Sequence, residues 1–62
     1  MHKVFHEDGE EVKTGEIIWL GLNSFIFLRT DGKRIEMQTT DDRRMFVWIE
    51  PERMKLTIKE MK

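Results

Sequence analysis

The dipeptide Asp31-Gly32 is the feature that most restricts how this chain can fold. Asp-Gly favours a two-residue hairpin turn of type I′, because both residues tolerate the positive φ angles that this turn requires. It lies between residues 25–30 and 33–38, which are rich in residues that favour strands. The sequence therefore predicts an antiparallel hairpin over residues 25–38.

The rest of the chain predicts further short strands joined by polar turns. Asp8-Gly9 suggests a first hairpin, and Asn23-Ser24 suggests a turn before the central one. Pro51 follows Glu50 and either starts a helix or forms a single turn before a strand, and we favour the single turn at residues 51–53. The predicted strands are residues 3–6, 10–13, 16–22, 25–30, 33–38, 44–49 and 54–59.

The chain is predicted to be one small domain over residues 1–62. At 62 residues it is near the lower limit for unaided folding, and it has no cysteine to form a disulfide or a cysteine-based zinc site. Its stability must come from apolar packing, strand pairing or self-association. The apolar runs are far too short to span a membrane, so we expect a soluble, cytoplasmic protein.

The last third of the chain carries a resemblance to a known fold. Residues 47–56 read Val-Trp-Ile-Glu-Pro-Glu-Arg-Met-Lys-Leu. This segment resembles the end of SH3-like barrels, in which a strand, a one-turn helix and a last strand close the sheet. The resemblance implies an all-β fold, a small SH3-like or OB-like barrel of about five or six antiparallel strands with one short helical turn near Pro51. It implies no function.

The turn also predicts which residues face the core. A two-residue turn places Leu28 opposite Ile35 and Ile26 opposite Met37, and we expect these two pairs on the core face. On the later strand, we expect the core positions to be Met45, Val47 and Ile49, and on the earlier strand we expect Trp19 to be buried. The reverse face then carries the candidate binding residues Phe25, Phe27, Arg29, Arg34, Arg44, Phe46 and Trp48.

Three explanations compete for this aromatic and arginine-rich face. First, the sheet curls so that the N-terminal hairpin, with Val4, Phe5 and Val12, covers the aromatic side chains as a second small core. Second, the face is a contact surface for a protein partner or a second copy of the chain. Third, it stacks the bases of a single-stranded nucleic acid, because aromatic residues interleaved with arginines form such platforms. The net charge of -1 and the pI of about 6.1 argue against the third.

No motif for catalysis or metal binding emerges from the sequence. The four glycines are spread singly and form no phosphate-binding loop. His2 and His6 near the N-terminus and Asp41-Asp42 beside two arginines are more simply explained as solvated polar groups. We therefore expect no catalytic residue, no metal and no small-molecule cofactor. The predicted function is a non-catalytic protein-interaction or regulatory module, with binding of single-stranded nucleic acid as the alternative.

Overall fold

The computed structural model describes all residues from 1 to 62 and shows an all-β domain. Six strands form two antiparallel sheets, and the one helical element is a single 3₁₀ turn. This confirms the predicted fold class, including the short helical turn near Pro51. The elements are β1 (His2–Phe5), β2 (Ile17–Leu20), β3 (Asn23–Thr30), β4 (Ile35–Thr39), β5 (Phe46–Ile49), η1 (Pro51–Met54) and β6 (Thr57–Glu60).

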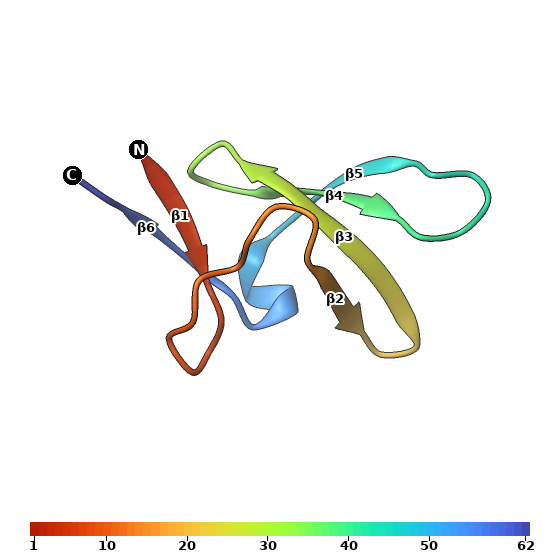
Figure 1. The fold of residues 1–62 in the computed structure, drawn as a ribbon, viewed down its shortest axis with the longest axis horizontal. Helices are drawn as coiled ribbons and strands as arrows, with labels where there is room; N and C mark the ends of the chain where they lie inside the picture. Colours follow the sequence, from red (N-terminus) through yellow and green to blue (C-terminus); the bar gives the residue numbers. More distant parts are fainter.

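The two sheets differ in size and position. Strands β2, β3, β4 and β5 form the larger sheet in chain order, while β1 and β6 form a two-stranded ribbon that brings the two chain ends together (Figure 1). Residues 11–16 connect the sheets, because the Val12 N–H donates to the Val4 carbonyl and the Gly15 N–H to the Phe27 carbonyl, both at 2.8 Å. No pairing joins β5 to β6, so the strands do not close into a complete barrel.

The C-terminal turn forms as the sequence predicts. Pro51 starts η1, and Lys55 ends it in the left-handed region at a φ of 57°. The Leu56 N–H then donates to the Pro51 carbonyl at 3.0 Å and redirects the chain into β6. Because Lys55 is not extended, the last strand starts at Thr57 rather than at residue 54.

One hydrophobic core lies between the larger sheet and the elements that cover it. Ile35 and Met37 of β4 are at its centre, with no side-chain surface left exposed. The N-terminal segment contributes two valines, and the C-terminal turn contributes a methionine and a leucine. The buried residues are Val4, Val12, Ile18, Phe27, Ile35, Met37, Met54 and Leu56.

The central hairpin forms, but its loop is longer than the sequence predicts. The Asp31 carboxylate accepts hydrogen bonds from the backbone N–H groups of Lys33 and Arg34, at 2.9 and 2.8 Å. These bonds stabilise a four-residue loop over residues 31–34 in place of the two-residue turn. Thr30 consequently pairs with Ile35, so the predicted pairing of Leu28 with Ile35 is wrong.

A β-bulge at Leu28 then exchanges the two faces of β3. Arg29 pairs with Glu36 and Phe27 pairs with Met37, which leaves Leu28 as the extra residue. Because neighbouring residues of a strand face opposite sides, one extra residue reverses the orientation of the rest of the strand. Phe27 is therefore buried, and Phe25 packs against the core. The prediction that Phe25 and Phe27 lie on the outer face, with Ile26 and Leu28 in the core, is wrong.

Candidate functional site

The face of the larger sheet that points away from the core is the candidate site, and we call it the outer face. The strand register places its side chains in rows across the sheet. Ile17 of β2 pairs with Ile26 of β3, which pairs with Gln38 of β4, which pairs with Phe46 of β5. A second row contains Arg29, Glu36 and Trp48. The outer face therefore combines aliphatic, aromatic and arginine side chains.

Large apolar side chains on this face are exposed to solvent. The exposed fractions are 64% for Trp19, 63% for Phe46, 56% for Ile17 and 37% for Trp48. The burial of Ile18 on the opposite side of β2 explains the exposure of Ile17 and Trp19, because the neighbours of a buried strand residue point to the other face. The prediction that Trp19 lies in the core is therefore wrong.

Two arginines lie over the ring of Trp48. The guanidinium carbons of Arg29 and Arg34 are 5.4 and 5.6 Å from the ring centroid, within the range of cation–π attraction. Arg29 Nε also donates to Glu36 Oε1 at 2.7 Å. This cluster joins the β3–β4 loop to β5, and it leaves Arg34 without an acidic partner in the chain.

An open groove crosses the outer face beside the exposed isoleucine of β2. Its volume is about 450 Å³. Aliphatic side chains of β2 and β3 contribute one part of its lining, and polar side chains of β4 and the following loop contribute the rest. The lining residues are Ile17, Ile26, Gln38, Thr39, Thr40 and Arg44.

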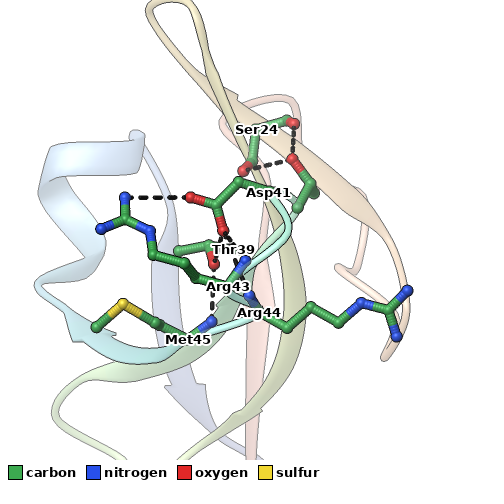
Figure 2. Close-up of polar contacts among 7 residues, drawn as sticks. Ser24, Thr39, Asp41, Arg43, Arg44 and Met45 are labelled. Atoms are coloured by element: carbon green, nitrogen blue, oxygen red, sulfur yellow. Dashed lines mark hydrogen bonds and ion pairs between the residues drawn. The ribbon is translucent and has the colours of Figure 1, made fainter.

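The loop between β4 and β5 is organised by the carboxylate of Asp41 (Figure 2). Asp41 Oδ1 accepts from the Thr39 hydroxyl at 3.0 Å and from the backbone N–H groups of Arg43 and Arg44 at 3.1 and 3.3 Å. Thr39 Oγ1 in turn accepts from the Met45 N–H at 2.8 Å. These bonds hold Arg44 in the left-handed region at a φ of 48°.

The same loop gives its two arginines different surroundings. Arg43 Nη2 lies 3.3 Å from Asp41 Oδ2. The Arg44 side chain leaves the loop in the opposite direction and lines the groove (Figure 2). Met45, predicted to be a core residue, is half exposed at 50%, because the loop continues through it and β5 starts only at Phe46.

Protonation of Asp41 is expected to loosen this loop at acidic pH. The hydroxyl bond from Thr39, followed by the N–H bonds from Arg43 and Arg44, lowers the pKa of Asp41. A lowered folded-state pKa adds stability above the unfolded-state pKa, and this is lost as the pH falls through the folded-state pKa. We expect Asp41→Asn to lower the urea midpoint at neutral pH, where the ionised carboxylate stabilises the loop, and to match the unchanged chain more closely in acid, so that its acid sensitivity is smaller.

Asp42→Asn is the matched control for that substitution, because the Asp42 carboxylate accepts none of these hydrogen bonds. The remaining acid sensitivity of the Asp41→Asn variant is expected to come in part from Asp31. Its pKa is also lowered, chiefly by the Arg34 backbone N–H and then by that of Lys33. An unchanged acid sensitivity in Asp41→Asn would contradict the assigned role of Asp41.

The structure separates the seven predicted site residues into two groups. Arg29, Phe46 and Trp48 lie on the outer face. Arg34 reaches this face from the loop between β3 and β4, and Arg44 lines the groove. Phe25 and Phe27 belong to the core side instead. Sequence reasoning missed three outer-face residues, and two of them lie in the uniformly apolar residues 17–20, where no polar position marks the exposed side. The missed residues are Ile17, Trp19 and Ile26.

Comparisons with known proteins find no match from which a function could be transferred to this chain. No protein-family model matches the chain, and no curated protein and no solved structure matches it either. No group of three or more His, Cys, Asp or Glu side chains is placed to hold a metal ion. The structure contains no helix long and apolar enough to cross a membrane.

Proposed function

We propose that this chain is a non-catalytic protein-binding module of the cytoplasm, which binds its partner through the outer face. The observation that carries the proposal is the exposure of Ile17, Trp19 and Phe46 on one hydrogen-bonded sheet surface, each more than half exposed. Exposed apolar side chains interspersed with polar groups on one face are characteristic of protein interfaces, and tryptophan and arginine are common anchors within them.

The energetic gain from covering this face is large for so small a domain. Complete burial of a large apolar side chain contributes about 1.5 to 3 kcal/mol. Because Ile17, Trp19 and Phe46 are 56%, 64% and 63% exposed, covering all three offers roughly 3 to 5 kcal/mol before the costs of association are subtracted. They project from strands whose hydrogen bonds already fix the backbone, so little backbone entropy is lost when a partner binds.

The charges around the outer face indicate the chemistry of the partner. Arg34 and Arg44 form no ion pair within the chain. Glu36 is the acidic residue of this face, and it already accepts a hydrogen bond from Arg29. A partner that presents apolar side chains bordered by carboxylates would complement both parts of the surface.

Single-stranded nucleic acid is the second candidate, supported by aromatic and arginine side chains that share one sheet face. The surroundings of Trp48 favour a protein partner. Arg29 and Arg34 lie over the Trp48 ring, so a base could stack there only by displacing a guanidinium. Trp19 and Phe46 alone would remain as stacking positions.

Tryptophan fluorescence provides a direct test, because both tryptophans of the chain lie on the outer face. The immobilised chain is first used to isolate binding proteins from an extract of its source cells, and each is then purified and titrated. We expect a saturable change in fluorescence with one of these proteins and none with a mixed single-stranded oligonucleotide.

The reverse result would replace this proposal with the alternative. A fluorescence change with the oligonucleotide that weakens steeply with added salt would indicate that phosphate contacts dominate binding. Binding of a purified protein that leaves both tryptophans unaffected would place the interface elsewhere on the chain.

A further inference from the structure

Strand β5 is an open edge of the larger sheet. It pairs with β4 on one side, and no strand pairs with it on the other (Figure 1). The opposite edge strand, β2, is packed against η1, and β6 carries the charged residues Lys59 and Glu60. The sequence of β5 is Phe-Val-Trp-Ile, without a charge. Natural sheet edges are usually covered or charged, because unpaired backbone groups recruit further strands.

The outward backbone groups of β5 belong to Phe46 and Trp48. The Thr39 N–H donates to the Met45 carbonyl at 2.8 Å, which makes these residues a hydrogen-bonded pair of the β4–β5 ladder. Such pairs alternate along antiparallel strands, so Val47 also directs its N–H and carbonyl towards β4. Phe46 and Trp48 then direct theirs away from the sheet.

We propose that β5 pairs antiparallel with β5 of a second copy, about a two-fold axis at Val47. In this register Phe46 lies opposite Trp48 of the second copy, and by symmetry Trp48 lies opposite Phe46 of the second copy. Each pair exchanges two N–H···O bonds, so every outward backbone group of β5 is satisfied. A shift of the register by two residues would pair Phe46 or Trp48 with a residue outside the strand.

The side chains fit the same register. Phe46 and Trp48 share the outer face, so the two pairs across the axis are aromatic, which favours cross-strand contact. Arg44 and Glu50 flank β5, and once the Arg44 side chain swings out of the groove they come opposite each other at both ends of the contact. Neither has an ion pair in its own chain, and both are exposed. This self-complementarity is what a two-fold symmetric interface requires.

Such a dimer goes beyond the proposed function, because it forms by backbone pairing at the edge of β5 and does not require a partner to cover the outer face. Two four-stranded sheets would join into one eight-stranded sheet. Their outer faces would become one surface, with aromatic side chains continuous across the axis. A partner could then contact both copies.

Sedimentation of the full chain at several concentrations is the first test. We expect a monomer–dimer equilibrium with a dissociation constant between roughly 10 µM and 1 mM, because the edge of a four-residue strand buries less surface than a standard stable interface. A chain that remains monomeric throughout this range would overturn the proposal.

Charge reversal tests the register. Arg44→Glu places a carboxylate opposite Glu50 of the second copy at both ends, so we expect the dissociation constant to rise at least about tenfold. Glu50→Arg should have the same effect, and its side chain forms no capping bond in η1 that would be lost. An equimolar mixture of the two variants should associate as a heterodimer, and failure of the mixture to do so would contradict this register.

Cross-linking locates the axis. Val47 would lie opposite itself in a non-hydrogen-bonded pair, with Cα atoms about 4.5 Å apart, which suits a disulfide. The chain has no cysteine, so Val47→Cys should form a covalent dimer on oxidation, while Trp19→Cys at the far edge of the sheet should not. Cross-linking through position 19 alone would place the dimer contact elsewhere. Partner binding by the Glu50→Arg variant, whose changed side chain lies outside the proposed binding surface, would leave the proposed function intact even if the dimer fails.

Discussion

Replacing Phe27 with alanine is expected to lower the free energy of unfolding by about 3 to 5 kcal/mol. Phe27 is 5% exposed and packs within the core cluster that also contains Val4, Val12 and Met37. Its removal leaves a cavity that a small domain has few side chains to fill. Because such a domain has only a few kcal/mol of stability to lose, the variant is expected to be largely unfolded in water. Urea denaturation followed by circular dichroism measures the effect.

Two further variants keep this expectation testable if the alanine variant does not fold. Phe27→Leu retains most of the side-chain volume and should cost less than about 1.5 kcal/mol. Phe46→Ala removes the same ring from the outer face, where the side chain is 63% exposed, and should change the free energy by about 0.5 kcal/mol or less. Equal costs for Phe27→Ala and Phe46→Ala would contradict the bulge at Leu28, because both rings would then be equally exposed.

Replacing Trp19 with alanine is expected to weaken partner binding at least about 30-fold, which corresponds to about 2 kcal/mol. Trp19 has the largest exposed aromatic surface of the outer face, and a protein partner would remove it from water. The free energy of unfolding should change by no more than about 0.5 kcal/mol, since the ring contributes little to the core. Titration of the purified partner measures the affinity.

Leu22→Ala is the matched control, because Leu22 is also a large apolar residue and is 96% exposed. It lies in the turn between β2 and β3, beyond the paired residues of the outer face. This substitution should leave affinity unchanged. If Leu22→Ala weakened binding as much as Trp19→Ala, the binding surface would be the end of the sheet and not its face.

The all-β class, the central hairpin and the turn at Pro51 could be predicted from local sequence. Each depends on residues close together in the chain, such as the Asp31-Gly32 dipeptide or the fixed φ of Pro51. The strand register could not be predicted in this way. The Asp31 carboxylate caps two backbone N–H groups and lengthens the loop, and the bulge at Leu28 depends on contacts from distant segments. One of these is the Thr14 hydroxyl, which donates to the Leu28 carbonyl at 3.0 Å.

Only part of the candidate site could be predicted, because the face on which a side chain lies depends on the strand register. Phe46 and Trp48 follow a regular alternation within β5, and no bulge interrupts their pairing with β4. Phe25 and Phe27 precede the bulge, so an error of one residue placed both on the wrong face. Trp19 was misplaced because four consecutive apolar residues, Ile17–Leu20, carry no polar position to mark the exposed side.

The role of the outer face as the binding surface is tested most directly by NMR, with the isotope-labelled chain titrated with its purified partner. We expect the largest shifts at the indole N–H groups of Trp19 and Trp48 and at the backbone amides of Ile17 and Phe46. Signals from the β1–β6 ribbon should stay near their free positions. Unshifted indole signals, with changes confined to the ribbon, would show that the partner binds on the other side of the domain.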